Sequence, residues 1–418
     1  MNILEEIQTC PVEWKELGEI SQFYSGLTGK TKSDFENGNA KYVTYKNIFN
    51  NIQVEFNLLE TVQVDKNERQ NFIEYGDVLI TGSSESKEEV GMSSTVTFVP
   101  DEQIYLNSFS FGIRFNEDIE LLPEFTKYLF RNIRLRKQIE KTASGVTRYN
   151  ISKVAFKKIK IPLLSREIQE KIVQILDKMT EYVTELTSEL TSRKKQYSFY
   201  RDKLLSFEDE VYQVEWKTLD AVSERTSNIS WNKVGDDEKF KYIDLSSVDR
   251  VSNKITETTS ITKSTAPSRA QKIVKSNDII LGTTRPTLKR FTKITDDYND
   301  QICSTGFYVF RTNGEVLPNY VYHIFSSSDF YKYLEENQSG ASYPAISDAL
   351  IKKYKIPVPS LEIQSRIVQV LDNFDTVCND LNIGLPKEIE LRQKQYEYFR
   401  EKLLTFVAEG EYSESRVE

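Results

Sequence analysis

The feature that most constrains the fold is a long segment that occurs twice. KIKIPLLSREIQEKIVQILD begins at Lys158, and KYKIPVPSLEIQSRIVQVLD begins 195 residues later, at Lys353. Further pairs in the same order are VEWKELGEIS with VEWKTLDAVS, YGDVLITGSS with SNDIILGTTR, SGVTRYNIS with SGASYPAIS, and KQYSFYRDKLLSF with KQYEYFREKLLTF. Self-similarity of this kind indicates one structural unit built twice. The 418 residues are therefore predicted to form two copies of a unit of roughly 200 residues, each with its own core.

Both copies of this segment continue into a helical pattern. Ser165 and Ser360 are suitable N-cap residues, and the apolar residues after them are spaced by three and four. Such a stripe must be buried, so we expect the two helices to pair along one seam. The predicted seam consists of Ile168, Ile172, Ile175, Met179 and Leu186 in the first helix and of Ile363, Ile367, Val370, Phe374 and Val377 in the second.

The second helix has a predicted interruption at NIGLPKEI, where Gly384 and Pro386 should kink or break it. The offset between the copies changes from 195 to 199 residues across this region, which places a net insertion of four residues near the break. Because four residues are close to one helical turn, the seam could continue beyond the insertion.

The remaining parts of the copies are more diverged and have the pattern of mixed, β-rich domains. YGDVLIT, SSTVTFV, NDIILGT and FYVFRT have strand composition, and short helices are expected after LLPEF and VLPNY. The predicted fold class is α+β, with two β-rich mixed globular domains in a tandem pseudo-symmetric repeat, separated by two long antiparallel coiled-coil-like helices. The predicted boundaries are 1–157 for the first domain, 158–213 for the first helix, 214–352 for the second domain, and 353–418 for the second helix and tail.

Few residues have the chemistry of a catalytic site. The single histidine, His323, is predicted to be a partly buried structural side chain. SGLTGKT lacks a glycine five residues before the GKT, where Tyr24 stands, so a phosphate loop is not indicated. The acidic clusters ESKEEV and GDDEKF lack metal-ligand spacing and are predicted to be solvated loops. The three cysteines lie far apart and indicate neither a disulfide framework nor a zinc site: Cys10, Cys303 and Cys378. The sequence favours a binding or scaffold protein over an enzyme and predicts no metal site.

Composition adds two expectations. Hydrophobic residues make up 39% and charged residues 28%, no apolar run is long enough to cross a bilayer, and the opening MNILEEIQTC is acidic, so we expect a cytoplasmic protein. The formal net charge of −8 argues against a surface that binds nucleic acid everywhere, but it leaves room for local basic loops.

Basic and polar residues gather in the loops where the copies diverge. Lysine and arginine suit phosphates and guanine edges, while serine, threonine and asparagine make shorter contacts in a groove. Most such residues on any protein are merely solvated. Because these lie in the regions that differ between the copies, we predict a DNA contact surface, with candidates Thr28, Lys30, Lys32, Lys46, Asn47, Ser83, Ser84, Lys87 and Arg148 in the first domain and Lys233, Thr283, Thr284, Arg285, Lys289 and Arg290 in the second.

The ordered, duplicated motifs resemble the specificity (S) subunit of type I restriction-modification systems over essentially the full length. The motifs that carry the resemblance are the two segments at Lys158 and Lys353, the GDVLIT and NDIILGT strands, the SGVTRYNIS and SGASYPAIS segments, and the two KQY helix ends. TELTSEL, at Thr184, is also similar to the short repeats in the first long helix of that family.

The resemblance implies a non-catalytic, sequence-specific DNA-binding subunit. Each head would be a target recognition domain that reads one half of a bipartite, asymmetric site on double-stranded DNA, and the helices would set the spacer between the halves. The expected partners are two methyltransferase (M) subunits and possibly restriction (R) subunits. S-adenosylmethionine, ATP and Mg would be bound by those partners, and this chain would bind no cofactor.

Two other interpretations remain open at this point. One is a stand-alone, duplicated DNA-binding regulatory protein without a methyltransferase partner. The other is an enzyme, a nuclease or transferase with an unfamiliar carboxylate site, which would be active as the purified chain alone. Copurification of a methyltransferase separates the first alternative from the S-subunit interpretation.

Overall fold

A computed structural model describes residues 3–207 and 214–406. The chain forms two compact units: unit 1 holds the residues up to Thr184 together with those from Leu391 onward, and unit 2 holds Glu185–Glu390. These units cut across the predicted boundaries, because each contains parts of both long helical regions. Within the described ranges, no helix is long and apolar enough to cross a membrane.

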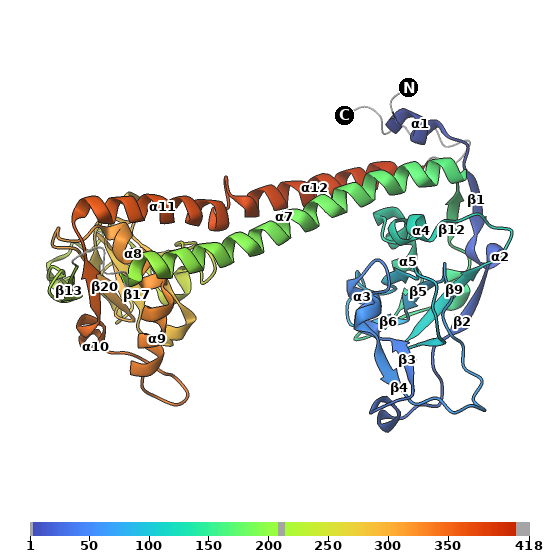
Figure 1. The fold of residues 1–418 in the computed structure, drawn as a ribbon, viewed down its shortest axis with the longest axis horizontal. Coiled ribbons are helices and arrows are strands. Elements are labelled where there is room, and N and C mark those ends of the chain that lie inside the picture. The colour runs from blue at the N-terminus through green and yellow to red at the C-terminus, as the bar shows by residue number, and fades with distance from the viewer. Residues whose placement is uncertain (1–2, 208–213, 407–418) are drawn as a thin grey trace. The chain divides into compact units, whose positions relative to one another are not determined.

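Unit 1 is built from four small sheets with short helices around them (Figure 1). Strands β2 (Ser21–Ser25), β9 (Ser110–Phe115), β5 (Val78–Thr81) and β7 (Ser93–Thr95) form the largest sheet, in that order. The other sheets are β4-β3-β8 (Glu60–Val62, Ala40–Val43, Ile104–Leu106), β10-β11-β6 (Ala143–Ser144, Tyr149–Ile151, Ser83–Ser84), and β1 (Glu13–Glu16) with β12 (Lys160–Leu163). The helices are α1 (Ile3–Thr9), α2 (Leu17–Ile20), α3 (Tyr45–Asn50), α4 (Pro123–Leu129), α5 (Ile133–Lys141) and α6 (Lys153–Phe156).

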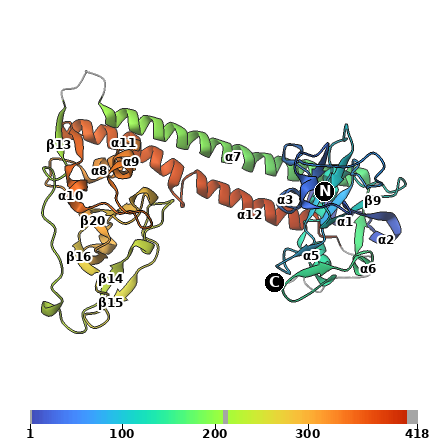
Figure 2. The same ribbon diagram turned by 90° about the horizontal axis from the view of Figure 1, so that it is seen from below.

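Unit 2 repeats most of this plan. Its sheets are β15-β14-β19-β16 (Thr259–Ile261, Phe240–Ile243, Gln301–Ser304, Ala270–Val274), β18-β17-β20 (Phe291–Lys293, Ile279–Gly282, Phe307–Phe310), and β13 (Glu215–Thr218) with β21 (Lys355–Val358). The helices α8 (Pro318–Ser326), α9 (Ser328–Asn337) and α10 (Asp348–Lys353) follow. Figures 1 and 2 both show α8 beside α11 (Leu361–Asn379) in this unit.

The central strands confirm the predicted pattern. All four residues of β5 and of β17 are buried, as expected for GDVLIT and NDIILGT. The helices expected after LLPEF and VLPNY are α4 and α8, and each starts at its proline, where the missing backbone N–H costs nothing.

Each unit has one buried carboxylate paired with one arginine at the same place. In unit 1, Arg114 donates to both oxygens of Asp77, at 2.9 and 2.7 Å. In unit 2, Arg311 donates to both oxygens of Asp278, at 2.8 and 2.7 Å. The aspartates directly precede the central strands β5 and β17, and the arginines lie in β9 and directly after β20, so each pair ties a central strand to its neighbour. The pair raises the pKa of Arg311, chiefly through the hydrogen bonds to Asp278.

The long helices are α7 (Arg166–Ser206), α11 and α12 (Leu385–Leu403). The predicted interruption is confirmed, because α11 ends at Asn379 and α12 begins at Leu385. A Cβ atom at Gly384 would collide with the carbonyl oxygens of Thr376 and Asp380, so a glycine fits this tight turn where a larger residue would not.

The helices pack on the units as well as on each other. Ile168 and Ile172 lie in the core of unit 1, and Ile367 lies in that of unit 2. The predicted places of Val370 and Val377 on a buried seam are wrong, since these side chains are 44% and 41% exposed. In α11 the buried stripe runs through residues that follow the 3.6-residue period, namely Ile367, Leu371, Phe374 and Cys378.

The remaining predicted seam residues are at least partly buried. Ile175 packs on the core of unit 1, Ile363 and Phe374 pack on that of unit 2, and Leu186 is 8% exposed. Met179 is half-buried.

Helix pairing occurs inside each unit. In unit 1, Arg392 of α12 lies over the ring of Tyr182 in α7, and Tyr396 interacts with Thr180, so the two segments run antiparallel. In unit 2, the ring of Phe374 in α11 stacks on Tyr197 in α7.

Each unit is also completed by the end of the helix that comes from the other copy. Leu403, Leu404 and Phe406 lie in the core of unit 1. The equivalent stretch at the end of α7 supplies Tyr197 and Leu205 to the core of unit 2. Carboxylates on these ends also bind helix starts: Glu401 accepts from the N–H of Ile133 at 3.0 Å, and Asp202 accepts from the N–H of Ser328 at 3.1 Å.

Candidate nucleic-acid interface

A short hairpin next to the central strand defines the candidate site in each unit. In unit 1, β10 and β11 form this hairpin, and β11 pairs with β6, the strand that follows β5. The turn contains Gly145 at φ +145°, where a Cβ atom would collide with the carbonyl oxygen of Arg148, so the turn requires glycine. We call the place where this hairpin pairs with the segment that follows β5 or β17 the hairpin site.

The hairpin site of unit 2 has the same pairing. Ala345 bridges to both Ser339 and Thr284, as Asn150 pairs with Ser144 and Ser83 in unit 1. Its turn glycine is Gly340, at φ +105°. The two copies therefore keep one backbone arrangement, although the residues between the turn glycine and the isoleucine differ.

In unit 1 the hairpin site opens into a pocket of about 550 Å³. Arg148 at the hairpin tip donates from Nε and Nη2 to Oγ of Ser83, at 3.1 and 2.9 Å, and its guanidinium lies 5.7 Å from the centre of the Phe109 ring. Tyr45 in α3 donates its hydroxyl hydrogen to the carbonyl oxygen of Ser83 at 2.9 Å. The pocket is lined by Tyr45, Lys46, Phe49, Asn50, Ser83, Ser84, Glu85, Glu89, Phe109 and Arg148.

Helix α3 is held in place by a partly buried arginine from another segment. Arg131 donates to the carbonyl oxygens of Ile48 and Phe49, at 2.9 and 3.2 Å, and to that of Ser93. Burial lowers the pKa of Arg131 to about 10. Because these carbonyls belong to the end of α3 and to the edge strand β7, the contacts fix the helix against the central sheet.

In unit 2 an arginine reaches the hairpin site from the other side. Arg285 follows β17 and has a left-handed backbone, φ 49°, held by a hydrogen bond from its N–H to the carbonyl oxygen of Pro344 at 2.6 Å. Its guanidinium lies 4.7 Å from the centre of the Tyr343 ring. A non-glycine residue in this conformation is strained and persists only where its surroundings fix it.

A second basic residue of this loop is also placed against an aromatic ring. Lys289, at φ 51°, lies 4.2 Å from the centre of the Tyr331 ring. Burial lowers the pKa of Lys289, and the charge of Arg201 acts in the same direction.

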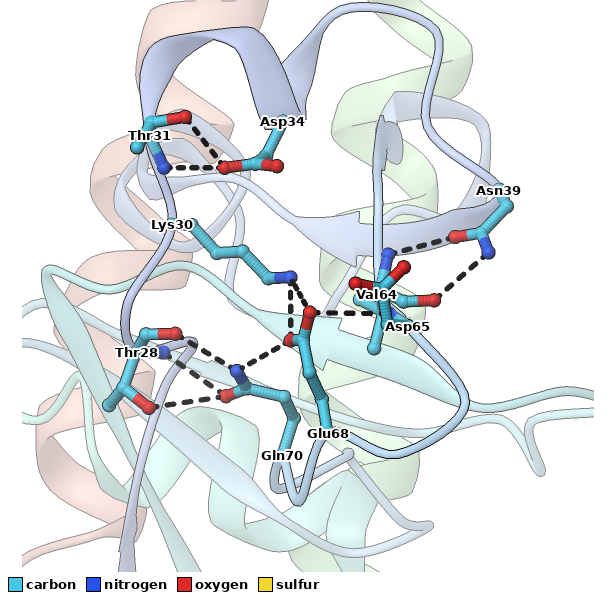
Figure 3. Close-up of polar contacts among 9 residues, drawn as sticks. All are labelled: Thr28, Lys30, Thr31, Asp34, Asn39, Val64, Asp65, Glu68 and Gln70. Carbon is cyan, nitrogen blue, oxygen red and sulfur yellow. Dashed lines mark hydrogen bonds and ion pairs between the residues drawn. The ribbon is translucent and has the colours of Figure 1, made fainter.

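Several predicted contact residues serve the fold of their own loops (Figure 3). Lys30 is paired with Glu68 at 2.6 Å, and its side chain is only 5% exposed. Its ammonium group is therefore already bound to a carboxylate of the same unit. The same pair lowers the pKa of Glu68. Thr28 and Gln70 exchange hydrogen bonds, with the backbone N–H of Thr28 donating at 3.1 Å. These contacts join the segment after β2 to the one after β4.

Two further candidates are buried, and we no longer assign them as DNA contacts. Asn47 is 1% exposed and uses its amide to bind the backbone of Glu55. Thr283 is 8% exposed and donates to the carbonyl oxygen of Gly306 at 2.9 Å. Arg290 is partly buried, and its Nε has no partner among the described residues.

The structure brings only part of the predicted set together. Lys46, Ser83, Ser84 and Arg148 line one pocket, and Thr284 and Arg285 occupy the matching place in unit 2. Lys32 and Lys87 of unit 1 are exposed and lie outside the pocket, and Lys233 of unit 2 is also exposed. None of the three forms a salt bridge within the described ranges.

The prediction missed the aromatic residues of the site: Tyr45, Phe49, Phe109, Tyr331 and Tyr343. A signal for one of them was present, because Tyr343 in SGASYPAIS aligns with Arg148 in SGVTRYNIS. Aromatic faces and guanidinium groups side by side suit a nucleic acid base. In residues 3–207 and 214–406 no three His, Cys, Asp or Glu side chains gather as a metal site.

The chain is similar to known proteins both in sequence and in structure. A specificity subunit of a type I restriction enzyme from Escherichia coli is 35% identical over 273 residues, which cover 61% of this chain and 65% of that protein. A putative type I restriction enzyme specificity subunit from Haemophilus influenzae is 29% identical over 279 residues, covering 63% of this chain and 68% of that protein. The aligned part is thus just under two thirds of the length of the first relative.

Solved structures show the same fold at low identity. The S subunit of a type I restriction-modification system from M. genitalium superposes with a TM-score of 0.51 and 16% identity, covering 96% of this chain and 98% of that one. The HsdS subunit from Thermoanaerobacter tengcongensis superposes with a TM-score of 0.51 and 14% identity, covering 94% and 95%. A chain from work on assembly and conformational transition of the type I R-M system reaches 0.65 at 14% identity, covering 95% and 98%.

The family model described as "Type I restriction modification DNA specificity domain" matches twice, over residues 11–193 and 214–391. These two matches coincide with the two sequence copies and together cover most of the chain. The protein is therefore a member of the type I restriction modification DNA specificity domain family, with two such domains in tandem.

Proposed function

We propose that this chain is the DNA specificity subunit of a type I restriction-modification complex. Unit 1 would read one half of a bipartite, asymmetric DNA site and unit 2 the other half. The observation that carries the proposal is the pair of hairpin sites. They share a backbone arrangement but present different side chains, Arg148 in one and Arg285 with Tyr343 in the other. A duplicated scaffold with diverged contact residues is what two different half-sites require.

The chain would act without catalysing a reaction. Methyl transfer and cleavage would belong to methyltransferase and restriction subunits, which would bind S-adenosylmethionine, ATP and Mg. This chain would contribute the choice of sequence through side chains on its hairpin sites, and spacing through its long helices. A helix of 41 residues is about 60 Å long at ~1.5 Å per residue, more than one turn of DNA, ~34 Å.

Two methyltransferase subunits would need two equivalent surfaces, and the described residues offer such a pair. Trp14 faces Pro162 across β1 and β12, and Trp216 faces Pro357 across β13 and β21 in the same register. Each tryptophan lines a pocket, of about 490 Å³ in unit 1 and about 870 Å³ in unit 2. Trp216 is 51% exposed, which is unusual for a large aromatic residue unless a partner covers it.

Methylome sequencing of cells with and without the gene tests the proposal. We expect one bipartite, asymmetric motif to be methylated only when the gene is present, and a methyltransferase to copurify with the chain. A purified chain that binds a specific site with no methyltransferase partner in the cell would instead support a stand-alone regulator.

Exchange of residues 214–352 for those of another family member tests the assignment of one unit to one half-site. The expected result is a change in one half of the methylated motif, with the other half and the identity of the methylated base retained. A change in both halves would contradict the assignment.

A further inference from the structure

Resting on the proposed function, we propose that Arg148 and Arg285 are the residues that recognise a guanine in the two half-sites. Each would bind the O6 and N7 acceptors of one guanine in the major groove. Arg148 would do this for the half-site of unit 1 and Arg285 for that of unit 2.

The free donors of Arg148 support this role. Ser83 occupies Nε and one hydrogen of Nη2, and the other three N–H donors, which include the outer Nη1/Nη2 pair, have no partner among the described residues. Glu85 and Glu89 line the same pocket, yet neither forms a salt bridge with Arg148. A guanidinium held on one edge and free on the other is ready to donate two parallel hydrogen bonds, the geometry that guanine accepts.

Arg285 is also available to bind a base. Its side chain is exposed, and none of its five donors has a partner in the part of the chain that the structure describes. The Tyr343 ring supports its guanidinium from one face, and the hydrogen bond to Pro344 fixes its backbone. Ordering the side chain before DNA arrives lowers the entropy that binding would cost.

Other arginines of the same loops or strands do not share these properties. Arg114 and Arg311 are occupied by Asp77 and Asp278, and Arg290 is partly buried. Unlike these neighbours, the two candidates are exposed and have no carboxylate partner among the described residues, and each lies over an aromatic ring.

The two arginines stand at different positions of the repeat but belong to equivalent hairpin sites. In the repeat, Arg148 aligns with Tyr343, and Arg285 aligns with Ser84. The hairpin of unit 1 thus supplies the arginine over a small residue on the strand, whereas in unit 2 the strand supplies the arginine and the hairpin supplies its aromatic support. Both arrangements put one guanidinium at the same junction, which suggests that each half-site has a base pair read in the same way.

The test uses the full chain in complex with its methyltransferase partner and DNA that contains the methylated motif. Each guanine is replaced in turn by 7-deazaguanine, which lacks the N7 acceptor, and affinity is measured at one fixed salt concentration, because phosphate contacts depend on salt. We expect a loss of roughly tenfold at one guanine in each half-site, within the range of a lost bidentate contact. A half-site that contains only A·T pairs would overturn the proposal for its unit.

Substitutions then assign each guanine to its residue. In Arg148→Gln, the 7-deazaguanine effect should vanish in one half-site and the methylome should show a relaxed base at that position, with the other half unchanged. Arg285→Gln should do the same in the other half. Arg148→Lys keeps the charge but not the paired donors, so it should relax the motif as Gln does while affinity for DNA of random sequence stays within about twofold.

Arg166→Gln is the matched control, because it removes an exposed arginine from the start of α7, outside the hairpin site. It should leave the motif unchanged. If Arg148→Lys preserves the motif, the contact is with a phosphate and the inference is wrong. If the unmodified complex binds no bipartite site at all, the proposed function fails as well, so the two failures can be told apart. If a variant does not fold, the 7-deazaguanine series on the unmodified complex still tests whether one guanine is read in each half-site.

Discussion

The pair of Asp278 and Arg311 predicts that unit 2 can be destabilised on its own. Asp278 is 1% exposed and Arg311 16% exposed at the side chain, and they share two hydrogen bonds. Substitution of Arg311 by Met leaves a buried carboxylate without its cation, which costs about 3–5 kcal/mol in such pairs. The hydrogen bond from the N–H of Lys275 to Asp278 remains, at 2.8 Å. We therefore expect a loss near the lower end, about 3 kcal/mol.

Urea unfolding followed by hydrogen–deuterium exchange measures this loss for each unit separately. Peptides from unit 2 should lose protection at lower urea, and those from unit 1 should not. The double variant Asp278→Asn with Arg311→Met should be less destabilised than Arg311→Met alone, since no unpaired charge stays buried. Arg366→Met, which breaks an exposed pair in α11, is the control and should cost less than about 0.5 kcal/mol.

A loss below about 1 kcal/mol for Arg311→Met would refute the reasoning that a buried charge is left unpaired. Equal losses in both units would refute the independence of the two cores. Because Asp278 directly precedes β17, the strand that leads to Arg285, the variant should also weaken recognition of the second half-site before the first. Arg114→Met, which unpairs Asp77, should give the mirror result in unit 1.

Three further outcomes are expected. Deletion of Thr187–Leu190 removes about 6 Å of helix at ~1.5 Å per residue, so methylome sequencing should show a spacer one or two base pairs shorter with both half-sites unchanged; altered half-site bases would contradict this. Trp216→Ala should weaken one of two methyltransferase binding events by about 2 kcal/mol, roughly 30-fold, in calorimetry of the complex, whereas exposed Val154→Ala should have no effect. Burial raises the pKa of the Cys303 thiol from 9.0 to about 12, so unfolding free energy should fall as pH rises from 9 to 12, and fall less in Cys303→Ala; an equal fall in both proteins would exclude this cause.

The sequence predicted the repeat, the central strands and the break in the second helix because these depend on local signals. Gly384 shows this well: a glycine followed by a proline interrupts a helix in almost any context. The buried face of α11 was harder to predict. Val370 and Leu371 are both apolar, and only the surface against which the helix packs decides that Leu371 is buried and Val370 exposed.

The contact residues show the same limit. Lys30 and Arg148 look alike in sequence as basic residues in diverged loops. In the part of the chain that the structure describes, however, Glu68 pairs with Lys30 from 38 residues away, and no carboxylate pairs with Arg148. Pairing over such a distance depends on how the loops fold, which no periodicity reports. The aromatic partner of Arg148 was missed for a similar reason, because the fold of the sheet, and not closeness in sequence, brings Phe109 next to Arg148.

The helix ends that each unit takes from the other copy also set an order for folding during synthesis. Unit 2 is continuous in sequence, so all of it has been made once residue 390 leaves the ribosome. Unit 1 begins first but needs Leu403, Leu404 and Phe406 to close its core. The domain that is translated first therefore keeps part of its apolar surface open until residues 403–406 have been added. A chain truncated anywhere before Leu403 would lack the segment that closes the core of unit 1. Chaperones and proteases that bind exposed apolar surface would then recognise the truncated chain.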